Sequence, residues 1–139
     1  PAMDTLMVWD RYPLAHAARI AERVVTAELA TARDQHDAAI AALEKAVAIE
    51  DGIPYDEPPG WHSPVRHTLG AVLLDAGRPA DAERVYREEL KRNPGNGWSL
   101  FGLAQSLRAQ GKTAEAARAQ REFTTAWREA DIRLTASRL

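Results

Sequence analysis

An internal repeat of 34 residues is the feature that most limits what this sequence can fold into. Matching apolar, glycine and alanine positions recur at this period: Leu69 and Leu103, Leu73 and Leu107, Gly77 and Gly111, and Ala82 and Ala116. Each unit predicts two helices that are separated at the glycine. Roughly a fifth of the residues are Ala, the best helix former, so we expect an all-α protein.

Local sequence signals mark the boundaries of the predicted helices. We expect helices over residues 63–76, 79–93 and 96–110 and from residue 113 onward. Ser63 is the expected N-cap of the first, with Pro64 in its first turn, and Pro79 restarts the next helix in the same way. The turn-forming residues 93–97 separate the two repeats. These signals place each helix boundary to within a few residues.

A weaker copy lies upstream. We expect a first helix over residues 14–33 and a second helix that carries Ala39, Ile40 and Leu43. Ala39 lies 43 residues before Ala82, so extra residues enter the connection at an inserted loop, 53–62. The sequence therefore predicts one domain over residues 1–139, with repeats at about 20–53, 63–96 and 97–130.

The final helix is expected to continue to about residue 137. Phe123, Trp127, Ala130 and Leu134 follow one another at helical spacing and form an apolar stripe. This stripe either covers the last repeat of the same chain or contacts a second copy in a homodimer. Both alternatives stay open at this point.

The repeated spacing resembles the tetratricopeptide repeat, as found in the C-terminal repeat region of a bacterial-type protein. The matching positions are Arg66, Leu69, Gly70, Leu73, Ala82, Tyr86 and Pro94, then Leu100, Leu103, Ala104, Leu107 and Ala116. The second copy departs from the pattern with Gln120 in place of an aromatic residue and Arg128 in place of proline. The resemblance implies antiparallel helical hairpins stacked as a short right-handed superhelix, and a non-catalytic scaffold that binds proteins.

One side of the first helix of each repeat is free of the expected packing positions. Residues about 160° away from Leu69 and Leu73 project from the opposite side of that helix. These positions are His67, Thr68, Ala71 and Asp75 in one repeat and Trp98, Phe101, Gln105 and Arg108 in the next. The resemblance implies that they lie on a concave face that holds an extended peptide or a partner helix.

Trp98 and Phe101 allow two interpretations. They are either an aromatic anchor for a partner, with Arg108 and His67 as polar or anionic contacts, or core residues beneath the inserted loop. Some members of the family clamp a C-terminal carboxylate with Lys and Asn side chains in this groove. Here the matching positions carry His67, Ala71, Phe101 and Gln105, so that clamp is missing.

The inserted loop is rich in proline and carries aromatic and acidic residues. Prolines lower the entropy cost of holding one conformation, and Tyr55 and Trp61 can bury area outside a helix. The loop either covers the seam between the first two repeats or forms a rim over the groove, with Asp56 and Glu57 facing basic partner groups.

Charge and motifs exclude several classes of function. The formal net charge is -2, and the arginines alternate with acids along the helices, so we expect no nucleic-acid partner. No apolar run approaches the roughly 20 residues of a membrane span, and we expect no membrane partner. There is no cysteine, His-Glu-x-x-His motif or glycine-rich phosphate loop, so we expect no metal, cofactor or catalytic residues. A ligand or metal site at His62, His67 and the loop acids is a minor alternative.

The leading hypothesis is therefore a cytoplasmic, non-enzymatic module that binds a protein or peptide through the concave face. The alternative is a structural or self-associating end domain of a larger protein. The chain begins at Pro1 rather than Met, which suggests a fragment from which a targeting segment has been removed.

Overall fold

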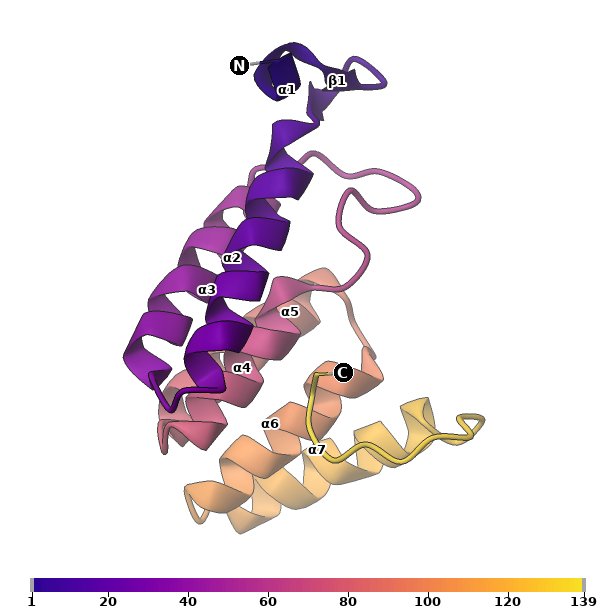
Figure 1. Ribbon diagram of the computed structural model, residues 1–139. Coiled ribbons are helices and arrows are strands. Elements are labelled where there is room, and N and C mark those ends of the chain that lie inside the picture. The colour runs from indigo at the N-terminus through magenta and orange to yellow at the C-terminus, as the bar shows by residue number, and fades with distance from the viewer. Residues whose placement is uncertain (1, 139) are drawn as a thin grey trace. The chain divides into compact units, whose positions relative to one another are not determined.

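The computed structural model describes residues 2–138, which are mostly helical (Figure 1). The elements are α1 (Ala2–Thr5), β1 (Met7–Val8), β2 (Tyr12–Pro13), α2 (Ala15–Thr31), α3 (His36–Asp51), α4 (Val65–Asp75), α5 (Pro79–Arg92), α6 (Gly97–Ala109) and α7 (Thr113–Ala126). The all-α prediction is confirmed, since the two strands hold only two residues each. Pro1, on which the expectation of a fragment depends, lies outside the described residues.

Two compact units make up the chain, one ending at Val65 and the other beginning at Arg66. In the first unit, α2 and α3 pack on each other as a hairpin. Ile20 and Leu43 are fully buried in this hairpin, as are Ala27 and Ala46. The small alanine side chains let the two helix backbones approach closely. The turn between the helices contains Asp34 at a positive φ of 57°.

A short antiparallel strand pair precedes this hairpin, in a segment for which the sequence predicted no element. Val8 pairs with Tyr12, and Trp9 and Asp10 turn the chain with φ values of 47° and 58°. Two central residues with positive φ are typical of the tightest hairpin turns. Residues 53–62 carry no helix or strand, as expected of a loop. The loop passes directly over Tyr12, because a Cβ on Gly60 would lie 2.6 Å from the Tyr12 hydroxyl.

The second unit is built around Tyr86 of α5. Its side chain is fully buried between α4 and α6. A Cβ on Gly70 or on Gly102 would lie only 2.3 or 2.2 Å from Cζ of the Tyr86 ring. The phenol therefore fits only because both facing helix positions lack a side chain. Gly70 is one of the positions that match the repeat pattern in the sequence, whereas Gly102 was not singled out.

The glycine breaks between helices are confirmed. Gly77 and Gly111 adopt φ values of 69° and 71°, which glycine reaches without steric cost. α5 begins at Pro79, as predicted. The Asn96 side chain caps α6 by accepting a hydrogen bond from the Ser99 backbone N–H at 3.1 Å. Local turn chemistry thus places four of the helix boundaries in this unit.

The expected capping of α4 by Ser63 is wrong. α4 begins at Val65, and the Val65 backbone N–H donates to the two carboxylate oxygens of Glu50 at 3.1 and 3.3 Å. A carboxylate at a helix N-terminus satisfies an otherwise unpaired N–H and interacts favourably with the helix dipole. Because Glu50 lies 15 residues earlier, at the end of α3, no local pattern revealed this contact.

The predicted extension of the last helix to about residue 137 is also wrong. α7 ends at Ala126, with Trp127 as its C-cap. The Trp127 indole Nε1–H donates to the Ile132 carbonyl at 2.9 Å, so the chain folds back at this point. Ala130 and Leu134 are therefore not part of a helical stripe. A straight helix would carry Ser137 away from the unit, whereas the reversal buries it. Self-association through this segment stays a prediction.

Candidate functional site

The residues predicted to bind a partner lie on α4 and α6 of the second unit. His67 and Ala71 are buried, and Thr68, Trp98, Phe101 and Gln105 are half-buried. Asp75 and Arg108 are exposed at the ends of their helices. The imidazole of His67 and the indole of Trp98 stack with their centroids 6.5 Å apart and their planes 24° apart. The structure thus brings together one residue from each predicted repeat.

These two rings belong to a larger set, which we call the aromatic row. Its members, in order of contact, are His67, Trp98, Trp127, Phe123 and Phe101. Neighbouring centroids beyond the first pair lie 5.3–5.7 Å apart, within the favourable range for aromatic contacts. Gly97 is essential to this packing, because a Cβ there would lie 2.3 Å from Cε3 of Trp127. The row joins α4, α6 and the end of α7.

His67 is a neutral member of the row at pH 7. Burial lowers the pKa of its imidazole to about 4, although a hydrogen bond with Asn96 acts in the opposite direction. Its Nε2 atom is buried and has no hydrogen-bond partner in the structure. His67 is therefore suited to apolar and polar contacts, and it does not supply the positive charge for an anionic group.

The segment that follows α7 lies against this part of the unit. We call residues 128–138 the tail. Ser137 is almost fully buried, and its hydroxyl donates to the His67 backbone carbonyl at 2.8 Å. Since its only proton is used there, the Tyr86 hydroxyl must donate to Ser137 Oγ at 2.5 Å. Burial raises the pKa of Tyr86, so its phenol keeps this proton.

A charged contact follows directly along the tail. The Arg138 guanidinium lies 3.4 Å from the Asp75 carboxylate on α4. At the other end of the face, the Arg108 guanidinium donates to the side-chain carbonyl of Gln120. Sequence reasoning missed the tail contacts, because Ser137 and Tyr86 are separated by 51 residues and no local pattern connects them. The predicted binding face therefore already carries part of its own chain.

The loop residues predicted to form a rim belong to the first unit. Arg11 fixes this loop by donating to the Asp56 carboxylate at 3.1 Å and to the Tyr55 carbonyl at 2.6 Å. Tyr55 is exposed, and its hydrogen bond to the Glu57 carboxylate raises the pKa of the phenol. The Trp61 ring packs on its neighbour His62, with centroids 4.7 Å apart. The loop acid Asp56 thus has a basic partner within its own unit.

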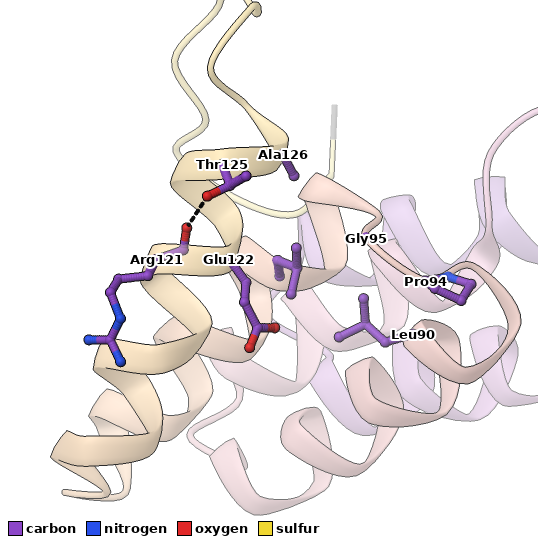
Figure 2. A pocket seen from close by; sticks show the side chains of 8 residues that line it. Leu90, Pro94, Gly95, Arg121, Glu122, Thr125 and Ala126 are labelled. Atoms are coloured by element: carbon purple, nitrogen blue, oxygen red, sulfur yellow. Dashed lines mark hydrogen bonds between the residues drawn. The ribbon is translucent and has the colours of Figure 1, made fainter.

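A pocket that the sequence did not reveal lies at the ends of α5 and α7, and Figure 2 shows it from close by. Its volume is about 680 Å³, and its lining residues are Leu90, Pro94, Gly95, Leu100, Arg121, Glu122, Thr125 and Ala126. The Thr125 hydroxyl is already used, since it donates to the Arg121 carbonyl at 3.1 Å. The remaining lining is mainly apolar and offers few groups that would orient a small ligand.

Two further properties limit the chemistry of the described chain. Within residues 2–138, no three His, Cys, Asp or Glu side chains gather where they could hold a metal ion. Over the same range, every helix is too short or too polar to cross a membrane.

Comparison with known proteins supports the resemblance noted from the sequence. Residues 73–121 match a family model described as the tetratricopeptide repeat. The match runs from the end of α4 through α5 and α6 into α7. Searches of curated proteins and of solved structures returned no significant match. Repeats of this kind generally serve as scaffolds for protein–protein interaction and are typically non-catalytic. Residues 73–121 are therefore similar to the tetratricopeptide repeat.

Proposed function

We propose that the second unit binds an extended segment of a partner protein on the face of α4 and α6 beside the aromatic row. The observation that carries this proposal is the tail itself. A stretch of chain without helix or strand already lies against this unit, where Ser137 forms two buried hydrogen bonds, one with the His67 carbonyl of α4 and one with the Tyr86 hydroxyl of α5. A surface that accepts such a segment from its own chain has the groups needed to accept one from another protein.

The face combines apolar area with charges at its edges. Trp98 and Phe101 are half-buried, so each still exposes ring surface that a partner could cover. Aromatic residues in such positions commonly supply most of the binding energy at an interface. Asp75 and Arg108 carry opposite charges and are exposed. They would therefore select the partner and the orientation of the bound segment more than they would add affinity.

The proposed role is a non-catalytic one in the cytoplasm, with a protein or peptide as the partner. The family match supports a scaffold. The alternation of acids and bases along α5, with Arg87 bonded to Glu83 and Lys91 to Glu88, supports a protein rather than a nucleic acid as the partner. Expression of a fluorescent fusion in cells tests the compartment.

Selection of displayed random peptides against the immobilised full chain tests the binding face. Hydrogen exchange on the resulting complexes should show new protection in α4 and α6. Asp75→Lys should weaken the selected peptides that carry a basic residue, while the matched control Glu88→Lys, with the same charge change on α5, should not. Protection confined to α5 and α7, or failure to enrich any peptide, would refute the assignment.

A further inference from the structure

The site occupied by Ser137 is shaped for a small hydroxyl side chain. Ser137 is about 1% exposed, so a larger side chain would have to displace its neighbours. Its oxygen lies between a donor, the Tyr86 hydroxyl, and an acceptor, the His67 carbonyl. An apolar residue here would leave the buried Tyr86 hydroxyl without an acceptor, which is costly. This site therefore discriminates by chemistry and by size.

The next position selects for positive charge. Arg138 lies beside Asp75, whose side chain is half exposed and can be reached from solvent. A lysine or arginine after the hydroxyl residue would gain from this carboxylate, and an acidic residue would be repelled. The two contacts together describe a short recognition pattern, a small hydroxyl residue followed by a basic residue.

The tail is held at few points. Most of its residues before Ser137, including Arg133 and Thr135, are exposed and bury little area. Segments with few buried contacts open locally at a small fraction of the cost of global unfolding. The tail can therefore leave the face while α4, α5 and α6 stay folded, because Tyr86 packs on Gly70 and Gly102 independently of it.

From these contacts we propose that the tail is an internal competitor that mimics the true ligand. The partner is a protein segment with a serine-sized hydroxyl residue followed by Arg or Lys, and it binds after the tail has left the face. This inference rests on the proposed function and deepens it. The apparent affinity for the partner is then reduced by the fraction of molecules whose tail is bound.

The test uses a fluorescent peptide with the sequence of residues 128–138, titrated against the full chain by anisotropy. Ser137→Ala in the chain removes the tail's two buried hydrogen bonds but leaves Tyr86 and His67 in place. This variant should bind the peptide about tenfold more tightly than the unmodified chain. Arg138→Glu in the chain should act in the same direction, by repulsion from Asp75. Thr135→Ala, at an exposed tail position, is the matched control and should change nothing.

Changes in the peptide should have the opposite effect. A peptide with alanine in place of Ser137, or with glutamate in place of Arg138, should bind the Ser137→Ala chain about tenfold more weakly than the unmodified peptide does. Circular dichroism establishes whether each chain variant is folded. If Ser137→Ala does not fold, Arg138→Glu keeps the test decisive.

Equal binding of the peptide by all four chains, or no binding by any of them, would overturn the inference. The proposed function is judged separately, by library peptides that protect α4 and α6. If such peptides are found while the tail peptide fails, the face binds partners but the tail does not mimic them. If neither binds, both proposals fail.

Discussion

Acidification should destabilise the second unit through His67 at a pH where carboxylates still contribute little. The imidazole has a pKa of about 4 in the folded chain, because it is buried, and an ordinary pKa of 6.5 when unfolded. The unfolded state therefore binds a proton first as the pH falls. The contribution of the neutral imidazole to the free energy of unfolding is fully present above pH 6.5, and it is lost progressively as the pH falls toward 4.

The magnitude follows from the two pKa values. Each pKa unit corresponds to about 1.4 kcal/mol, and most of the shift is expressed by pH 5. We expect the free energy of unfolding to fall by about 2 kcal/mol between pH 7.5 and pH 5 because of this one group. For a small unit of marginal stability, this is a large loss.

Urea unfolding followed by tryptophan fluorescence measures this loss, since Trp98 and Trp127 lie within the aromatic row. His67→Gln removes the titrating group and should flatten the profile between pH 7.5 and pH 5. His62→Gln, at an exposed histidine, is the matched control and should keep the wild-type profile. If the wild-type and His67→Gln chains lose the same free energy over this range, the burial argument is wrong.

Three other changes test the packing and the charges. Gly70→Ala should destabilise the second unit by about 1–3 kcal/mol in thermal unfolding, because its Cβ would overlap the Tyr86 ring. Glu50→Gln should cost about 1 kcal/mol in urea unfolding, because the Val65 N–H loses a charged acceptor. Burial alone would raise the pKa of Glu83, but hydrogen bonds from basic and amide side chains lower it to about 2. The contribution of the ionised Glu83 to the free energy of unfolding is present above pH 4.5 and should disappear as the pH falls toward 2. Acid titration of the folded fraction measures this loss.

Matched control substitutions show whether each of these losses of stability depends on the named contact. Gly52→Ala adds the same methyl group at a position whose nearest neighbour is an ordinary contact at 3.4 Å, and it should be nearly neutral. Glu44→Gln, on an exposed position of α3, controls for the loss of charge at Glu50. In the acid titration, Glu88→Gln is the corresponding control for Glu83→Gln. Equal losses in a variant and its control would show that the named contact has no special role.

The helices were predictable where their boundaries depend on adjacent residues. Pro79 and Asn96 act on the first turn of their own helix, and Gly77 and Gly111 terminate helices by their own backbone conformation. The resemblance to the tetratricopeptide repeat then singled out Tyr86. Local chemistry and periodicity were sufficient for this part of the fold.

The rest of the fold and the site depend on contacts between distant residues. Ser63 has the right side chain for a cap, but the Glu50 carboxylate takes that role from the preceding helix. Trp127 and Leu134 have helical spacing, yet burial of Ser137 against α4 and α5 favours a reversal of the chain. Sequence spacing contains no information on which of these competing contacts is stronger. The partner-binding residues themselves stay a prediction.

The ring and the hydroxyl oxygen of Tyr86 make different contacts, so one side chain has two separate roles. Its ring holds α4 and α6 around the two glycines, while its hydroxyl holds Ser137. A single base change in the codon converts tyrosine to phenylalanine, which would keep the ring and discard the oxygen. Evolution could thus adjust how firmly the tail is held without altering the helical scaffold. Tyrosine or phenylalanine at this position in related chains would then divide them into forms with a tightly and a loosely held tail.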